Sequence, residues 1–291
     1  MKVLITGTNG QLGWELQRTV PKGWQVTAFG HSELDITDAS SVDHVFCKIN
    51  PDLVINTAAY TAVDKAEEET GQAYAVNAQG AATIAQAAAE SNARLIHIST
   101  DFVFDGSKST PYLPSDSTNP LGVYGASKLE GEKQVTDILP EALIIRTGWL
   151  YSAHGHNFVK TMLKLMNDRE ELSVIGDQVG TPTWANELAK AIWDVAGIKD
   201  MKGIYHWTDG GLASWYDFAI AIQEEALEAG IINKAIPIQP IRTADYPTSA
   251  KRPSYSVLDK TATWDALGYK ANHWRVNLRK MLRELGELNN A

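Results

Sequence analysis

The sequence lacks most features that would assign it to a specialised class of protein. It has one cysteine, Cys47, in 291 residues, which excludes an internal disulfide and a thiolate metal cluster and fits a reducing, cytoplasmic location. No apolar run approaches the roughly 20 residues of a membrane span, and no signal-peptide hydrophobic region follows Met1. The net charge of −9 argues against a nucleic-acid binder, which must neutralise phosphates. These absences predict a soluble cytoplasmic protein that binds neither membrane nor nucleic acid.

Residues 2–16 carry the pattern of a strand, a glycine turn and a helix. The apolar run at 3–5 is typical of a parallel strand buried on both faces, and leucines then recur at helical spacing. Gly7, Gly10 and Gly13 stand between the two. Glycines permit a tight turn and a close approach of backbone N–H groups to a pyrophosphate, which the start of a helix attracts. Because the spacing is Gly-x-x-Gly-x-x-Gly and not Gly-x-Gly-x-x-Gly, a dinucleotide site needs further support.

Strands and helices alternate through the first half of the chain. Further strands are expected at 24–29, 53–56, 94–99 and 143–147. Strict alternation predicts a parallel sheet with right-handed crossovers, so the fold class is doubly wound, Rossmann-type α/β with a smaller C-terminal substrate-binding portion. We expect a dinucleotide-binding domain at 1–150, with elements returning to it around 184–208, and a substrate-binding portion at 151–183 and 209–291.

Residues suited to acid–base chemistry follow the fourth expected strand. Tyr124 and Lys128 lie four apart on an expected helix, and so share one face. An ammonium close to a tyrosine would lower its pKa from about 10 toward working pH. Ser99 or Thr100, at the strand's carboxyl end, could polarise a substrate carbonyl while Tyr124 supplies the proton. Tyr-x-x-x-Lys alone is weak, because it often marks only a solvated helix face.

The end of the second expected strand bears on the choice of cofactor. Gly30 stands where dinucleotide enzymes place an acid on the ribose hydroxyls of NAD. A missing carboxylate admits a 2′-phosphate, although no arginine stands nearby to bind it, so NADPH is preferred and NADH remains possible. Asp35 could accept from the adenine amino group or serve only as a turn residue, and the pattern leaves both open.

The glycine turn, Ser99-Thr100-Asp101 and Tyr-x-x-x-Lys, in that order, resemble the extended short-chain dehydrogenase/reductase superfamily. The chain also resembles one of its families, the dTDP-4-dehydrorhamnose reductases. The segments that carry this resemblance are 10–16, 56–64, 99–104, 146–151, 157–162, 176–183 and 252–253. It implies a reductase that transfers hydride to the 4-keto group of dTDP-4-dehydro-L-rhamnose, giving dTDP-L-rhamnose for cell-surface polysaccharide. Homodimers are common in the superfamily, so a homodimer is expected, and the alanine-rich helix expected at 74–89 is compatible with one.

Residue roles follow from the same resemblance. Catalysis would use Tyr124 as proton donor, Lys128 on the cofactor ribose, and Thr100 as the residue that tunes the hydrogen bonds of the site. The cofactor would be bound by Gly7, Gly10, Gln11, Leu12, Asp35, Ile36, Ala58, Ala59, Tyr60, Thr61, Ser99, Tyr124 and Lys128. The substrate would be bound by Thr100, Asp101, Trp149 and Arg252.

A few further features remain open. Arg252 is favoured over Lys160, Lys164 and Lys251 as the group that offsets a substrate diphosphate. The resemblance makes Mg²⁺ possible between subunits, through Glu15 on the first helix, with partner ligands that the sequence does not identify. His154-x-His156 is interpreted as part of a loop and not as a metal site. The Pro- and Ser-rich stretch at 106–120 is long enough for a lid or substrate loop.

Two other functions compete with the reductase. An epimerase or dehydratase on the same scaffold would need more acid–base residues than Asp101 beside the Ser/Thr, and would retain NAD⁺. A regulatory subunit that binds NADP and docks on a partner enzyme would not need Tyr124, Lys128 and Thr100. The presence of all three favours catalysis.

Overall fold

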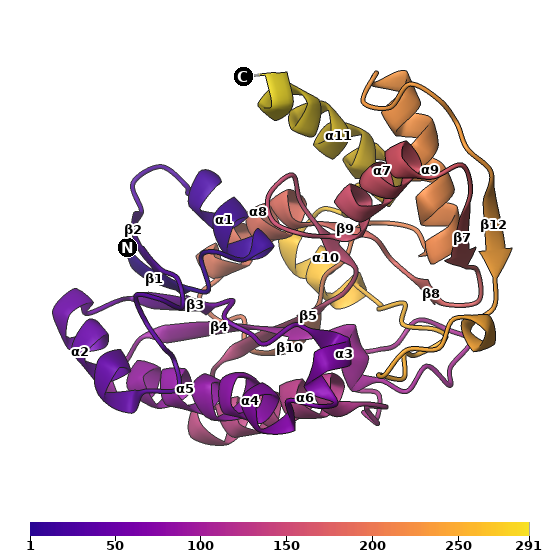
Figure 1. Ribbon diagram of the computed structural model, residues 1–291. Helices are drawn as coiled ribbons and strands as arrows, with labels where there is room; N and C mark the ends of the chain where they lie inside the picture. Colours follow the sequence, from indigo (N-terminus) through magenta and orange to yellow (C-terminus); the bar gives the residue numbers. More distant parts are fainter. Residues whose placement is uncertain (291) are drawn as a thin grey trace.

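The computed structural model describes residues 1–290, and a parallel sheet forms the centre of the molecule (Figure 1). In this part of the chain the sheet has six strands in the order β10-β5-β4-β3-β1-β2. The strands are β1 (Lys2–Thr6), β2 (Gln25–Phe29), β3 (Leu53–Asn56), β4 (Arg94–Thr100), β5 (Leu143–Thr147) and β10 (Gly203–His206). All neighbouring pairs are parallel. The order reverses at β1, with β2 on one side and β3 on the other, so the loops after β1 and β3 diverge and open a crevice for a ligand.

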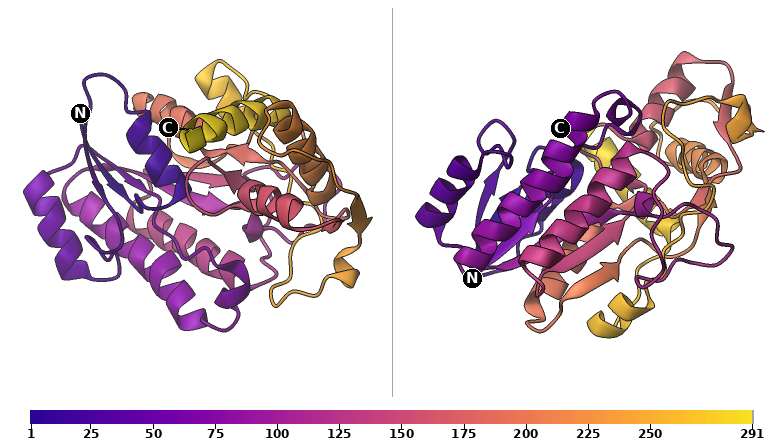
Figure 2. Two further views of the ribbon diagram at one scale, coloured as in Figure 1. Left: turned by 45° about the horizontal axis from the view of Figure 1, so that its top comes forward. Right: turned by 90° about the horizontal axis from the view of Figure 1, so that it is seen from below.

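Helices cover both faces of the sheet, which confirms the doubly wound class (Figures 1 and 2). One face carries α2 (Ala39–Ile49), α5 (Ala81–Glu90) and α6 (Val123–Ile138), and the other carries α1 (Gln11–Arg18), α8 (Ala185–Gly197) and α10 (Thr261–Leu267). Successive strand residues point to opposite faces. Leu4 therefore belongs to the core under α2 and α5, whereas Val3 and Ile5 belong to the core under α1 and α8.

Most of the rest of the chain builds a second, separate core beside the carboxyl ends of the strands. It contains α7 (Phe158–Asp168), α9 (Trp215–Glu228), α11 (Trp274–Asn290) and η3 (Thr243–Asp245). Its short strands are β6 (Leu150–Tyr151), β7 (Leu172–Ile175), β8 (Val179–Gly180), β9 (Thr183–Trp184), β11 (Ala213–Ser214) and β12 (Ile238–Ile241). Phe218, Trp274 and Leu278 are among the residues buried between the three helices. Figure 1 shows this portion overhanging the sheet edge.

The long alanine-rich helix expected at 74–89 is interrupted. The chain forms α3 (Val63–Ala66), α4 (Thr70–Tyr74) and a π-helical turn, η1 (Ala75–Gly80), before α5 begins. Ala85 and Ala88 of α5 are fully buried in the core on the sheet. The smooth face of this helix therefore packs within its own chain, and the homodimer stays a prediction.

The structure also bears on two other expectations. Within 209–291, α10 packs on the sheet and not in the second core, because Trp264 and Leu267 join the core of α8 and the Thr263 hydroxyl donates to the His206 carbonyl at 2.7 Å. The stretch 106–120 is fixed by Tyr112, which is 2% exposed and stacks on Phe104 at 4.2 Å. In residues 1–290 this stretch contributes nothing to the wall of the cavity described below, so a role as a lid or substrate loop stays a prediction.

Among the helices of the described residues, none combines the length and the apolar character that spanning a membrane requires.

Candidate active site

The carboxyl ends of the central strands open into a cavity of about 780 Å³. Every site residue predicted from the sequence lines it. These residues are Gly7, Gly10, Gln11, Leu12, Asp35, Ile36, Ala58, Ala59, Tyr60, Thr61, Ser99, Thr100, Asp101, Tyr124, Lys128, Trp149 and Arg252. The structure thus brings together segments from both ends of the chain, at the edge where parallel sheets bind ligands. The individual roles of these residues stay predictions.

The glycine turn after β1 leaves room for a ligand against bare backbone. Gly7 has a φ of +77°, and a Cβ there would stand 2.6 Å from the Ala58 backbone nitrogen. A Cβ on Gly13 would stand 2.4 Å from the Gly7 carbonyl oxygen, so the first turn of α1 packs directly on the loop. Gly10 precedes α1 as its N-cap residue. The turn therefore presents the start of a helix to the cavity and fits the pyrophosphate of a dinucleotide.

Residues at the end of β2 form the part of the cavity wall that is expected to contact the adenosine of the cofactor. A Cβ on Gly30 would stand 2.6 Å from the side-chain amide of Asn9, so Asn9 takes the space of a side chain at that position. Asn9 and His31 both line the cavity. Asp35 Oδ1 accepts from the Thr37 backbone N–H at 2.9 Å and from its hydroxyl at 2.8 Å. The structure therefore assigns Asp35 the turn role, and an adenine contact stays a prediction.

Asn77 joins the cofactor loop to the catalytic helix. Its Oδ1 accepts from the Tyr60 N–H at 2.9 Å, and its Nδ2 donates to the Tyr60 carbonyl at 3.1 Å and to Ser127 Oγ at 3.0 Å. Ser127 Oγ in turn donates to the Tyr124 carbonyl at 2.9 Å. Asn77 is 1% exposed and stands in the π-helical turn η1, which is a common device at functional sites. It fixes the distance between the two walls of the cavity.

Tyr124 and Thr100 form the reactive part of the site. Tyr124 is half-buried in the first turn of α6. Burial raises its pKa to about 12, against a smaller opposite effect of the Thr100 hydroxyl, and the negative charge of Asp101 raises it further. Lys128 therefore does not lower the Tyr124 pKa in the chain alone, and a lowering by Lys128 together with the positive nicotinamide of a bound oxidised cofactor stays a prediction. A tyrosine that keeps its proton suits a proton donor, which is the role that carbonyl reduction requires.

Lys128 points its amine into the sheet. Its Nζ donates to the Ile98 carbonyl at 2.6 Å, and burial lowers its pKa to about 8. The neighbouring Ser99 hydroxyl donates to Glu132 on α6, and Glu132 is paired with Arg146 at 2.6 Å in the protein interior. This buried pair engages the Ser99 hydroxyl, and the Thr100 hydroxyl donates to Asp101 Oδ1 at 3.1 Å, so the role of Thr100 toward a substrate carbonyl stays a prediction.

Aromatic and acidic groups form the wall opposite the glycine turn. Trp149 has a φ of +51° and stacks on Trp215, with ring centroids 3.5 Å apart and an interplanar angle of 2°. A Cβ on Gly180 would stand 2.5 Å from the Trp149 ring, and one on Gly148 would stand 2.5 Å from the Asp101 carboxyl carbon. Burial raises the pKa of Asp101 to about 6. Because Gly180 and Gly148 have no side chains, the Trp149 indole and the Asp101 carboxyl group have room at the cavity wall, where a sugar nucleotide would contact them.

Arg252 provides a cationic side chain on the substrate side of the cavity. It lines the cavity and pairs with Asp64 through Nη2 at 2.6 Å and Nη1 at 3.1 Å, which holds the pKa of Asp64 below its usual range. Lys160 and Lys164 line a separate cavity of about 340 Å³, and Lys251 is exposed. The preference for Arg252 over the three lysines agrees with this geometry.

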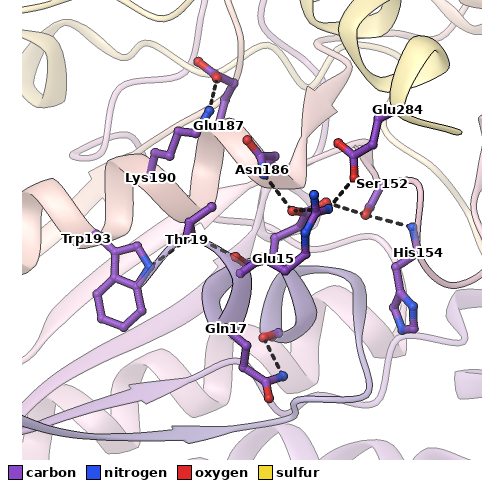
Figure 3. Close-up of polar contacts among 12 residues, drawn as sticks. Glu15, Gln17, Thr19, Ser152, His154, Asn186, Glu187, Lys190, Trp193 and Glu284 are labelled. Atoms are coloured by element: carbon purple, nitrogen blue, oxygen red, sulfur yellow. Dashed lines mark hydrogen bonds and ion pairs between the residues drawn. The ribbon is translucent and has the colours of Figure 1, made fainter. Parts of the chain in front are cut away.

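Glu15 is engaged within its own chain, and the metal site between subunits that the resemblance implies stays a prediction. The Glu15 side chain is 0% exposed and accepts from Ser152 Oγ at 2.8 Å, Asn186 Nδ2 at 2.8 Å and Arg18 Nη1 at 3.3 Å. Arg18 also pairs with Glu284 of α11. Figure 3 shows Ser152 and Asn186 beside the Glu15 carboxylate. Glu15 therefore joins α1 to α8 and α11, and within residues 1–290 no cluster of three or more His, Cys, Asp or Glu could hold a metal ion.

The two histidines of the loop before α7 serve the cofactor side. His154 stacks on Trp14 with ring centroids 4.8 Å apart. His156 and Asn157 line the cavity, and Asn157 Nδ2 donates to the Gln11 side chain at 2.9 Å. The loop interpretation of His154-x-His156 agrees with these contacts. Cavity residues that the sequence analysis did not single out for the site include Asn9, His31, Gln72, His156, Asn157 and Trp215.

Together, the fold and the site define an extended short-chain dehydrogenase/reductase. The glycine turn after β1, the hydroxyl residue at the end of β4 and the Tyr-x-x-x-Lys helix α6 all meet at one sheet edge. The family model of the RmlD substrate binding domain matches residues 1–287. The chain belongs to the dTDP-4-dehydrorhamnose reductase family, so the resemblance of its motifs is confirmed.

Individual relatives match over almost the whole chain. The dTDP-4-dehydrorhamnose reductase of Aggregatibacter actinomycetemcomitans is 43% identical over 287 residues, which span 96% of this chain and 98% of that protein. The crystal structure of a dTDP-4-dehydrorhamnose reductase from Clostridium acetobutylicum has a TM-score of 0.92 at 41% identity and covers 98% of this chain and 100% of its own. That of Bacillus anthracis, in complex with NADP, has a TM-score of 0.91 at 37% identity, covering 97% and 99%.

Proposed function

We propose that the protein reduces the 4-keto group of dTDP-4-dehydro-L-rhamnose with NADPH, giving dTDP-L-rhamnose. The observation that carries this proposal is the meeting of Thr100, Tyr124 and Lys128 beside the glycine turn in one cavity. Relatives that match nearly the full chain have the same named activity. NADPH would supply the hydride, and the chain supplies the proton, the orientation of the substrate and the exclusion of water.

The residues of the site divide this work between them. Thr100 and Tyr124 would hold the keto oxygen from one side, and Tyr124 would give it a proton as the carbonyl carbon is reduced. The raised pKa of Tyr124, about 12, keeps the phenol protonated until that moment. Asp101, Trp149 and Arg252 would orient the sugar, the base and the diphosphate, respectively, so that the reacting carbon faces the nicotinamide.

NADPH is the preferred cofactor in this proposal, with NADH possible. At the end of β2, Asn9 and His31 line the cavity beside Gly30, and Gly30 brings no carboxylate that would repel a 2′-phosphate. The Bacillus anthracis relative was solved with NADP. Asn9 has an amide that can donate to a phosphate oxygen, and His31 can add charge when protonated.

A spectrophotometric assay tests the proposal. Purified protein is mixed with dTDP-4-dehydro-L-rhamnose and either NADPH or NADH, and the loss of reduced-cofactor absorbance is followed. We expect turnover with both cofactors and a higher kcat/KM with NADPH. If the protein binds NADPH but consumes it with neither this sugar nor other dTDP-linked 4-keto sugars, the reductase assignment is wrong.

A further inference from the structure

A row of buried polar side chains runs behind the Lys128 amine, across three neighbouring strands. Thr6 of β1, Asn56 of β3 and His97 of β4 are side by side in the sheet register, and each is at most 1% exposed. Thr6 Oγ1 donates to Asn56 Oδ1 at 2.7 Å, Asn56 Nδ2 lies 3.1 Å from His97 Nδ1, and His97 Nε2 lies 3.5 Å from Lys128 Nζ. The row ends at Lys128, a residue of the active site, although the mechanism above uses none of Thr6, Asn56 and His97.

The hydrogen bonds determine which nitrogen of His97 carries the proton. The backbone N–H of Ala58 lies 3.2 Å from one atom of the Asn56 amide. Since a backbone N–H can only donate, that atom is the oxygen, and Asn56 Nδ2 must face His97. His97 Nδ1 therefore accepts, and the neutral ring carries its proton on Nε2. Burial lowers the pKa of His97 well below 6.5, so the ring stays neutral at working pH.

This tautomer presents a donor to the Lys128 amine. A lysine ammonium has three donors and no lone pair, so it gains no hydrogen bond from His97 Nε2–H, whereas the neutral amine can accept one. The Lys128 amine also faces the Ile98 carbonyl, to which it donates at 2.6 Å, and Glu132 on α6, which is bound to Arg146 of β5. Tyr124 lies one turn before Lys128 on the same helix. Glu132 favours the ammonium, but its charge is shared with Arg146. His97 therefore acts in the direction opposite to Glu132.

We propose that His97 is a positioning residue: locked as the Nε2–H tautomer by Asn56, it supports the neutral amine of Lys128 and so eases the release of the Lys128 proton during turnover. This rests on the proposed function. Tyr124 loses its proton to the substrate oxygen and becomes a phenolate. The Lys128 ammonium then gives up a proton that restores the phenol, and solvent returns a proton to the amine. His97 keeps its own proton throughout and stabilises the amine by a hydrogen bond.

Two substitutions of His97 separate this role from a structural one. His97→Gln reaches the position of Nε2 and can turn its Oε1 toward Nζ, which favours the ammonium. His97→Asn keeps an acceptor near Nδ1 for Asn56 but removes the group that faces Lys128. We expect the basic limb of the kcat/KM pH profile to move upward by about one pH unit in His97→Gln and by less in His97→Asn. We also expect kcat to fall several-fold in His97→Gln, because the ammonium holds its proton more tightly.

A second measurement reports the charge of Lys128 without turnover. With ¹³C-labelled lysine, the Cε resonance of Lys128, identified by its loss in Lys128→Met, gives the midpoint of its titration. We expect a higher midpoint in His97→Gln than in the unsubstituted protein. Variants that fold and bind NADPH but leave both the basic limb and this midpoint unchanged overturn the proposal, as does an equal loss of kcat at every pH. If the unsubstituted protein shows no turnover, the proposed function fails, and the midpoint still decides the role of His97.

Discussion

Replacing Gly180 by alanine tests how the protein holds its substrate. The new methyl group would stand 2.5 Å from the Trp149 ring. The ring has no free space on its other side, because it stacks on Trp215 with centroids 3.5 Å apart. Overpacking of this kind costs about 1–3 kcal/mol, and loss of the stack alone costs about 0.5–1.5 kcal/mol. If Trp149 contacts the sugar nucleotide, about 1–2 kcal/mol of this cost appears as a 5- to 30-fold higher KM for the substrate.

The assay separates the substrate from the cofactor. We expect Gly180→Ala to raise the KM for dTDP-4-dehydro-L-rhamnose and to leave the NADPH dissociation constant within about twofold, since Gly180 lies far along the chain from the glycine turn and lines the substrate wall through Trp149. Gly176→Ala is the matched control, because a methyl group there finds its nearest neighbour, Pro240 Cβ, at an ordinary 3.4 Å. An unchanged substrate KM in folded Gly180→Ala refutes the role of Trp149.

Three further predictions concern charge and stability. Lys128→Met should weaken NADPH binding, measured by isothermal titration calorimetry, and lower kcat, measured from initial rates. A Lys128→Met variant with normal NADPH affinity and normal kcat would show that Lys128 has no such role. Glu15→Ala should lower the free energy of unfolding by about 2–4 kcal/mol, because it leaves the buried Ser152 and Asn186 donors without their acceptor. Burial raises the pKa of Asp209 from 3.8 to about 8. As the pH rises, the unfolded chain therefore loses the Asp209 proton at a lower pH than the folded protein does. Asp209 therefore makes stability fall as the pH rises from about 4 to 8, by up to about 1.4 kcal/mol per pH unit. Asp209→Asn should flatten that fall in urea titrations, and parallel curves would oppose this reasoning.

The sheet and the glycine turn could be predicted because local patterns determine them. The apolar runs at 53–55 and 143–145 coincide with the first residues of β3 and β5, since strands buried on both faces are mostly apolar. Gly7 and Gly13 stand where a Cβ would clash with backbone, a requirement visible from their spacing. The strand ends then placed the candidate residues at one edge of the sheet.

Other features depend on partners distant in the sequence. The π-helical turn η1 holds Asn77 against Tyr60 and Ser127, and the helical pattern of 74–89 carries no sign of it. Glu15 sits on α1 at a position that suits either a metal ligand or a buried acceptor. Only the tertiary structure shows that Ser152 and Asn186 pack against it.

The Tyr124 pKa shows the same limit. Its spacing from Lys128 predicts an ammonium beside a phenol, but spacing along a helix does not say where a long side chain ends. The Lys128 amine turns to the Ile98 carbonyl, and burial then raises the Tyr124 pKa instead of lowering it. Desolvation follows from the tertiary structure, so the sign of the shift could not be derived from the motif.

The most direct test of the whole account is Tyr124→Phe in the reductase assay, beside Tyr205→Phe on the edge strand β10 as a control. The substitution removes one hydroxyl and preserves the ring that packs on Phe102 at 5.6 Å. We expect Tyr124→Phe to bind NADPH still and to lose at least about a hundredfold of kcat, whereas Tyr205→Phe retains normal turnover. Turnover by Tyr124→Phe at the rate of the unsubstituted protein would contradict the assignment of the proton donor, and with it the active site proposed for this chain.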